Sequence, residues 1–562
     1  MNTKPRENHL WTALVCAVIV LACALAIGMS FHLFVNYDTC AMQIIMNGNL
    51  SGQPDSRVFF MNILTTKFLV FLYQACPSVE WCSTFLFFAI LFSFWALLFR
   101  VMTILEDRRP MVRLTCCGCT ALIFLFLFLW DLIEISFTGC SVAAGFTLLV
   151  YILSAQRFDF KDWAMVLLLS VLCCGIRPPV MRAVMPYIFL AFLAKWTRKE
   201  FHASDLATIS AICLVLVASH VATILAYRDE YHDQRKMNSL RSAIQDYEGL
   251  PNYSNDKELY ESLDIDEVSY GVMRLSWGLS EDFNEDVLQT INEYNKSKID
   301  KIYRAKKLIN RVFFQHYNYA FWCVGIVLLC VAFCVLLRAK KYTSIAYLLL
   351  VIATGAGELL YLSYTGRLPR RVSCIVFFGT VAVCLGLILG EARDKRIFPG
   401  KRRFFVACAL LTALVALGIH GNLADYKPAD EQNQTWGQML HYFTEHPENT
   451  YCTNCTYNEP LKLRAMPTRN YLKISGWISG TLGWKTALRQ GHQTIWDAIA
   501  YRNDLRFCMA EEFMDILVFY LNQQGYCSEA ELEADPLDNE RYMIWRIKTE
   551  TSQMSEEESP AS

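Results

Sequence analysis

Residues 10–34 read LWTALVCAVIVLACALAIGMSFHLF, a run that contains no Asp, Glu, Lys or Arg. As a helix, this run would be about 37 Å long, which exceeds the roughly 30 Å hydrocarbon core of a bilayer. It follows a basic start at Lys4 and Arg6, and no small-residue cleavage site of a signal peptide follows it. We therefore expect a first membrane helix that is retained.

The composition of the chain fits many such helices. Of its 562 residues, 54% are hydrophobic and only 19% are charged, which excludes an ordinary soluble enzyme. The formal net charge of -1 provides no global field that would attract nucleic acid. Many of the 22 cysteines lie inside apolar runs, as Cys116 and Cys173 do, and are expected to be small packing residues.

Apolar runs recur along the first three quarters of the chain. They predict about eleven membrane spans, with approximate bounds 10–34, 82–104, 114–133, 139–155, 162–176, 180–196, 205–227, 318–337, 342–363, 370–390 and 403–421. One further run, residues 58–75, is ambiguous because it carries Lys67 in its middle.

The Lys and Arg residues of the short loops decide whether residues 58–75 cross, because these residues stay on the cytoplasmic side during insertion. Without that crossing, about twenty positive residues lie inside against about six in the short outer loops. We therefore expect 58–75 to be a juxtamembrane helix in the first outer loop, residues 35–81. The N-terminus is then cytoplasmic and the C-terminus lies outside a membrane that we expect to be the bacterial cytoplasmic membrane.

Two hydrophilic regions face the exterior in this topology, residues 229–315 and residues 422–551. The second mixes short apolar strands at 471–478 and 541–547 with a helical pattern at 509–523, which predicts a small α/β domain. The fold class is therefore mainly α: a polytopic transmembrane helical bundle, residues 1–421, with a C-terminal extracytoplasmic α/β domain. The polar, acidic residues 552–562 are expected to be a disordered tail.

Some arginines lie in three of the predicted outer loops, against the general excess of Lys and Arg on the cytoplasmic side. Guanidinium groups suit bidentate contact with phosphate oxygens, so these loops predict binding of a lipid-linked phosphate or diphosphate at the headgroup level. The alternative is that the arginines only snorkel to headgroups or pair with local carboxylates. The residues are Arg57, Arg177, Arg182, Arg367, Arg370 and Arg371.

Acidic residues lie on the same expected side. Asp38 follows the first span, and an ionised carboxylate there could act as the general base that removes a proton from an acceptor hydroxyl. Asp131 and Glu134 share one helical face at i, i+3 spacing and could hold a divalent cation, Mg²⁺ or Mn²⁺, that shields a diphosphate. Glu358 could orient an arginine or contact the sugar. Interfacial acids and simple salt bridges are the alternatives for all four.

The order of these features resembles the GT-C superfamily of integral-membrane glycosyltransferases. The features are the first span, the acid in NYDTC (36–40), the juxtamembrane helix, the second span, and the acids in WDLIE (130–134). Residues 38–81, with GQPDSR at 52–57, resemble bacterial multi-pass proteins related to the O-antigen glucosyltransferases. The resemblance implies that Asp38 is the catalytic or acceptor-orienting carboxylate and that Asp131 and Glu134 match the second acidic motif. The Asp-x-x-Glu spacing departs from the Asp-x-Asp of the family, so metal dependence stays open.

The expected C-terminal domain contains two further groups of residues with alternative roles. Its aromatics could stack on sugar faces, although places in the core of a small domain suit them better. These aromatics are Trp436, Trp477, Trp484 and Trp496. Cysteines at 452, 455, 508 and 527 could form a zinc site, but the spacing is unusual, and one or two disulfides suit an oxidising exterior better.

The function predicted from the sequence is that of a hexose-transferring membrane glycosyltransferase. It would move a sugar from a polyprenyl-phosphate or polyprenyl-diphosphate donor to a cell-surface glycan or lipid on the non-cytoplasmic face, in contact with membrane lipids. The alternatives are a polysaccharide polymerase or ligase and a transporter or flippase of lipid-linked saccharides. The clean apolar spans and the absence of an internal repeat disfavour the transporter.

Overall fold

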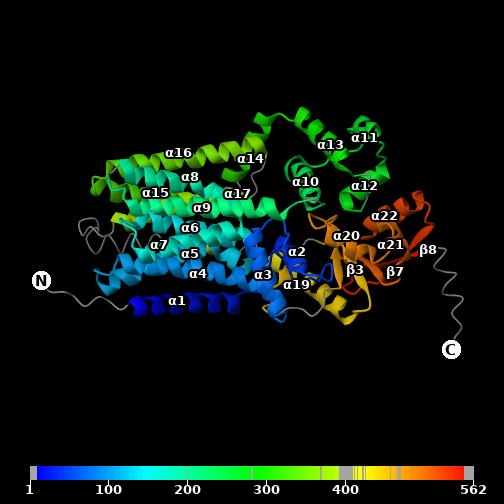
Figure 1. Cartoon of the computed structure of the whole chain (residues 1–562), viewed down its shortest axis with the longest axis horizontal. Helices are drawn as coiled ribbons and strands as arrows, with labels where there is room; N and C mark the ends of the chain where they lie inside the picture. Colours follow the sequence, from blue (N-terminus) through cyan, green and yellow to red (C-terminus); the bar gives the residue numbers. More distant parts are fainter. Residues whose placement is uncertain are drawn as a thin grey trace.

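The computed structural model shows a bundle of long helices with smaller domains at one end (Figure 1). It describes residues 9–197, 199–228, 230–279, 283–314, 316–366, 370–391, 409, 412–413, 415–420, 423, 426–455, 457–464 and 470–549, without the side chains of residues 248, 311–321, 370–372 and 374.

The long helices match most of the expected spans. Among the described residues, seven helices are long and apolar enough to cross a membrane, so the protein is an integral membrane protein. These seven are α1 (His9–Ser30), α4 (Trp81–Ile104), α5 (Pro110–Ile133), α6 (Phe137–Ser154), α8 (Pro178–Thr197), α9 (Ala203–Ala226) and α16 (Tyr342–Thr365).

Three of the other expected spans are also helices, and one falls mostly outside the described residues. Expected spans 162–176, 318–337 and 370–390 are the helices α7 (Phe160–Ile176), α15 (His316–Arg338) and α17 (Arg370–Glu391). Residues 403–421 lie mostly outside the described part of the chain. The count of eleven spans therefore stays a prediction.

Helix α3 (Ile63–Ala75) occupies the ambiguous run 58–75 and has 13 residues. Its length is roughly 20 Å, well short of the hydrocarbon core. It begins where Asn62 caps it, with the side-chain oxygen accepting a hydrogen bond from the backbone N–H of Leu64. The length agrees with a helix that does not cross, and its place at the membrane surface stays a prediction.

Helix α6 lies at the centre of the bundle, and all 18 of its residues are buried. Small residues allow this close packing: a Cβ added to Gly145 would lie 3.1 Å from the Val184 side chain on α8. On the α17 side, a Cβ on Gly386 would lie 2.7 Å from Leu153 of α6. The core of the membrane part is therefore built around α6.

The two ends of the bundle differ in chemistry. One end carries the ion pairs Arg100–Asp162, Lys195–Asp205 and Lys341–Glu391, at N–O distances of 2.6, 2.7 and 3.7 Å. Helix α1 begins at this end, and the smaller domains lie at the other end (Figure 1). The smaller domains, which come from segments far apart in the sequence, therefore lie together at the end opposite the start of α1.

The hydrophilic region that follows α9, which we call the outer helical region after its predicted side, is helical. It comprises α10 (Glu230–Ala243), a π-helical turn (Ile244–Glu248), α11 (Lys257–Ser262), α12 (Glu267–Leu275), α13 (Glu285–Lys298) and α14 (Lys301–Phe314). In Figure 1, α10 to α13 lie beside the C-terminal domain.

The C-terminal part contains a five-stranded sheet in the order β5-β3-β6-β8-β7. Its strands are β3 (Thr450–Thr453), β5 (Tyr471–Lys473), β6 (Leu505–Cys508), β7 (Ser528–Ala534) and β8 (Ile544–Thr549). The helices α19 (Tyr426–Glu445), α20 (Leu482–Arg489), α21 (Ile495–Tyr501) and α22 (Glu511–Gln523) accompany it. The strands expected near 471–478 and 541–547 are β5 and β8, and the helix expected at 509–523 is α22.

A second, three-stranded sheet joins three distant segments. Its strands are β1 (Phe34–Val35), β2 (Glu134–Ile135) and β4 (Glu459–Pro460), in the order β2-β1-β4. Strand β1 pairs in parallel with β2 and antiparallel with β4. The segment that joins α1 to α2 therefore lies between the loop that follows α5 and the C-terminal part of the chain.

Candidate functional site

The small sheet brings the two acidic motifs of the sequence together. In the β1–β2 register, Phe34 is opposite Glu134, and the Asn36 side-chain amide donates a 2.6 Å hydrogen bond to Glu134 Oε1. Asn36 also caps α2 (Tyr37–Met46), where its Oδ1 accepts from the backbone N–H of Asp38. A single asparagine thus links Glu134 to the first turn that carries Asp38.

Asp38 contacts the C-terminal domain directly. The indole Nε1–H of Trp477 donates a hydrogen bond to Asp38 Oδ1 at 3.2 Å, and the Asp38 side chain is half-buried. Phe59 and Phe60 pack edge-on against the same indole, with ring centroids 5.6 and 5.1 Å away. The carboxylate predicted to be catalytic is therefore oriented by a residue more than four hundred positions further along the chain.

Tyr37, which precedes Asp38, is held by the same domain. Its backbone N–H donates to Asn458 Oδ1 at 3.0 Å, and its hydroxyl donates to the carbonyl of Ser475 at 2.9 Å. Gly476 allows this approach, because a Cβ there would lie 2.7 Å from the Tyr37 hydroxyl and its φ is +76°. Burial raises the pKa of Tyr37 to about 12, so the hydroxyl is a neutral donor at physiological pH.

A buried charge pair lies beneath Tyr37. Lys473 Nζ is 3.4 Å from Glu459 Oε1, and both side chains are almost completely buried. The same ammonium group lies 4.1 Å from the centre of the Tyr37 ring, and the Tyr471 hydroxyl donates to Glu459. Lys473, on β5 of the five-stranded sheet, therefore contacts Tyr37 at the start of α2 and Glu459 on β4 of the small sheet.

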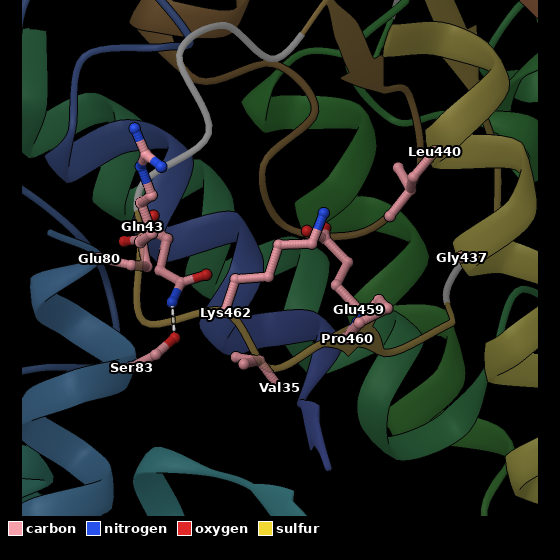
Figure 2. Close-up of a pocket in the computed structure, with 10 residues that line it drawn as sticks. Val35, Gln43, Glu80, Ser83, Gly437, Leu440, Glu459, Pro460 and Lys462 are labelled. Atoms are coloured by element: carbon pink, nitrogen blue, oxygen red, sulfur yellow. Dashed lines mark hydrogen bonds between the residues drawn. The ribbon is translucent and has the colours of Figure 1, made fainter. Parts of the chain in front are cut away.

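Figure 2 shows the adjoining pocket, where the C-terminal segment of Glu459, Pro460 and Lys462 meets Val35 and Gln43 of the first loop. The free space is only about 20 Å³, which holds about one water. Gln43 donates to Ser83 across one side of it. This pocket is a packed junction and is too small for a sugar.

A cavity of about 560 Å³ is lined by Trp477, the residue that binds Asp38. We call it the aromatic cavity. Its aromatic lining consists of Phe59, Trp277, Phe283 and Trp477, and its charged lining consists of Glu230, Asp233, Arg241, Glu285 and Lys485. Its volume is typical of a small-molecule site, and rings beside polar groups suit a sugar, which has apolar faces and hydroxyl edges.

Arg177, one of the expected arginines, lies near this site. It ends α7, and its guanidinium carbon lies 4.6 Å from the centre of the Phe137 ring and 5.8 Å from that of Phe60. Because Phe60 also packs on Trp477, Arg177 and Asp38 share one neighbourhood, connected through two aromatic side chains.

The other expected arginines are placed differently or are not described. The Arg57 Nε atom lies 2.9 Å from Asp55 Oδ1, and the guanidinium carbon lies 3.5 Å from the centre of the Tyr231 ring. Arg57 therefore pairs with a local carboxylate, which was the alternative to phosphate binding. Arg182 is exposed on α8. Arg367 lies outside the described residues, as do the side chains of Arg370 and Arg371.

Glu358 lies within α16 and accepts a 3.0 Å hydrogen bond from the Tyr187 hydroxyl of α8. This contact joins two helices inside the bundle. Its predicted role toward an arginine or the sugar stays a prediction.

The expected geometry of Asp131 and Glu134 is wrong in one respect. Helix α5 ends at Ile133, so Glu134 belongs to strand β2 and the two acids do not share a helical face. Asp131 accepts from the Ser136 hydroxyl at 3.0 Å beside the first turn of α6, whereas Glu134 accepts from Asn36. Among the described residues, no three His, Cys, Asp or Glu side chains are grouped to hold a metal. A cation held by Asp131 and Glu134 therefore stays a prediction, and the mechanism proposed below uses none.

The cysteines expected to form disulfides are free. Cys452, Cys455 and Cys508 are buried, and Cys527 is exposed. Burial raises the pKa of the Cys452 thiol to about 12 and that of Cys508 well above its usual value. The buried thiols therefore act as packing residues in the domain core.

Two of the expected stacking aromatics lie entirely in the core, since Trp436 and Trp484 are fully buried, and Trp496 is half-buried against Tyr520. Trp477 is the exception, because it lines the cavity. Arg241 is a cavity residue that the sequence did not reveal. It is one of many charged residues in the outer region, and only the fold places it there.

No family model matches the chain, and no curated protein matches it. Among solved structures, ArnT from Cupriavidus metallidurans bound to undecaprenyl phosphate aligns with a TM-score of 0.37 and 11% identity, over 94% of this chain and 97% of that one. Its apo structure aligns over the same shares at the same identity, with a TM-score of 0.34. A likeness this loose supports no statement about substrate or site, both of which rest on the chain's own residues.

Proposed function

We propose that this protein is a membrane glycosyltransferase that transfers a sugar from a polyprenyl-phosphate carrier to an acceptor hydroxyl at the end of the bundle that carries the C-terminal domain. One observation carries the proposal: Trp477 both lines the aromatic cavity and binds Asp38, at the membrane end where Arg177 also lies. A carboxylate, a sugar-sized cavity and a guanidinium group thus lie within a few side chains of each other.

In the proposed reaction, the acceptor lies in the aromatic cavity and the lipid phosphate lies near Arg177, with its tail among the helices. The acceptor oxygen attacks the anomeric carbon of the donor sugar. The bond from that carbon to the phosphate oxygen breaks, and the phosphate leaves with the electron pair. Asp38 takes the acceptor proton, and Arg177 stabilises the negative charge that develops on the phosphate.

The roles of the neighbouring residues follow from their contacts. The Trp477 N–H holds the Asp38 carboxylate in one orientation, and the Tyr37 bonds to the C-terminal domain fix the helix turn that carries it. Positioning of this kind lowers the entropic cost of reaching the reactive geometry.

The test is Asp38→Asn in purified protein supplied with undecaprenyl-phosphate-linked sugar and the host's own surface glycan. Transfer is expected to fall by at least about 100-fold, the usual contribution of a general base, at unchanged expression. Asp515→Asn, an exposed acid on α22, is the matched control and should retain full transfer. Retained turnover in Asp38→Asn would remove Asp38 from the mechanism.

A further inference from the structure

A second cavity, of about 400 Å³, adjoins the aromatic cavity in the outer helical region. We call it the distal cavity. It is lined by Gln245, Gly249, Leu250, Asn252, Tyr270, Arg274 and Trp277. Trp277 lines both cavities, so one side chain connects the two spaces.

A hydrogen bond forms a second connection between the cavities. Arg241 of the aromatic cavity donates through Nη1 to the Oε1 atom of Gln245 of the distal cavity. Gln245 belongs to the π-helical turn Ile244–Glu248, which ends at Gly249 with φ +82°. π-helical turns interrupt regular helices frequently at functional sites, and this one carries the chain from one cavity to the next.

The lining of the distal cavity suits a carbohydrate. Tyr270 is supported from behind by Tyr260 and Tyr253, at ring-centroid distances of 5.0 and 5.5 Å. A supported ring offers a fixed apolar face at little entropic cost. Gln245, Asn252 and Arg274 are exposed and offer amide and guanidinium donors for hydroxyl oxygens. Among the described side chains, the charged residue of this lining is Arg274.

We propose that the acceptor is a glycan of several sugars that occupies both cavities. Its terminal sugar lies in the aromatic cavity near Asp38, and the preceding sugars pass Trp277 into the distal cavity. This inference rests on the proposed function. It adds that the acceptor is recognised along its chain, so a single sugar or a short lipid headgroup uses only part of the site.

The experiment uses a size ladder prepared by partial acid hydrolysis of the host's own surface glycan, with undecaprenyl-phosphate-linked sugar as donor. KM is expected to fall by about tenfold between the shortest acceptor and acceptors long enough to reach the distal cavity, which corresponds to about one added stacked contact. Asn252→Trp fills the distal cavity from its exposed side and is expected to abolish this length dependence.

Trp277→Ala should abolish the length dependence as well, but a buried indole also supports the fold, so the exposed Asn252 provides the independent variant. Glu258→Gln, an exposed residue of α11 outside both linings, is the matched control and should retain the tenfold difference. A KM that does not change with acceptor length overturns the inference.

Release of free undecaprenyl phosphate separates this inference from the proposed function. If wild-type protein releases it and Asp38→Asn does not, the proposed function stands, and a flat KM then overturns only the two-cavity acceptor. If neither protein releases it, the proposed function fails and the acceptor inference fails with it.

Discussion

The buried pair Lys473–Glu459 supports the helix turn that carries Asp38, because the Lys473 ammonium lies against the ring of Tyr37. An ammonium that loses its carboxylate would remain as an uncompensated charge in the core. Glu459→Gln is therefore expected to lower stability by about 3 kcal/mol. The midpoint of thermal unfolding in detergent measures this loss. The double variant Lys473→Met with Glu459→Gln removes both charges and should recover at least about half of it. Equal losses in the single and double variants would argue against a buried ionic pair.

At the residue scale, the sequence predicts a candidate residue where its place next to a membrane span marks it. Asp38 follows a membrane span directly, and that position can be read from the chain. Its partner Trp477 could not be predicted, because 439 residues separate the two and only the fold joins them. Arg57 was expected at a phosphate, but Asp55 lies two residues away and provides a nearer partner. Pairing with a local carboxylate was the alternative for this arginine, and the GQPDSR stretch itself contains that partner.

At the scale of elements, the start of α6 depends on a glycine. A Cβ on Gly139 would lie 1.7 Å from Asp131 Oδ1, so Gly139→Ala must displace the carboxylate that accepts from Ser136. We expect a loss of about 2 kcal/mol. Gly118→Ala on α5 is the matched control, since nothing lies within 4 Å of its added Cβ, and it should be neutral or slightly stabilising. Thermal unfolding in detergent compares the two, and equal midpoints would contradict the tight contact.

The elements also show where prediction from sequence stops. Helices such as α4 and α9 were predicted almost to the residue, because an apolar run and its flanking polar residues define a span locally. Glu134 was assigned to the helix because its spacing from Asp131 is helical. The chain instead leaves the helix at Ile133 to pair with β1, and that pairing partner lies about a hundred residues earlier. Two-residue strands such as β1, β2 and β4 have no periodic pattern to read.

For the whole molecule, the arrangement predicts which groups face the exterior. The site, the outer helical region and the C-terminal domain lie at one end of the bundle, and α1 begins at the other (Figure 1). With a cytoplasmic N-terminus, as the positive loops indicate, the exposed Cys527 must face the exterior. We expect a membrane-impermeant maleimide to label Cys527 in intact spheroplasts and Cys527→Ser to lose that label. Arg109→Cys, an exposed position in the loop between α4 and α5, is expected to gain label only after lysis. Label at Arg109→Cys in intact spheroplasts, with Cys527 protected until lysis, would place the cavity on the cytoplasmic side. The donor and the acceptor would then be expected on the cytoplasmic side, because the site lies at only one end of the bundle.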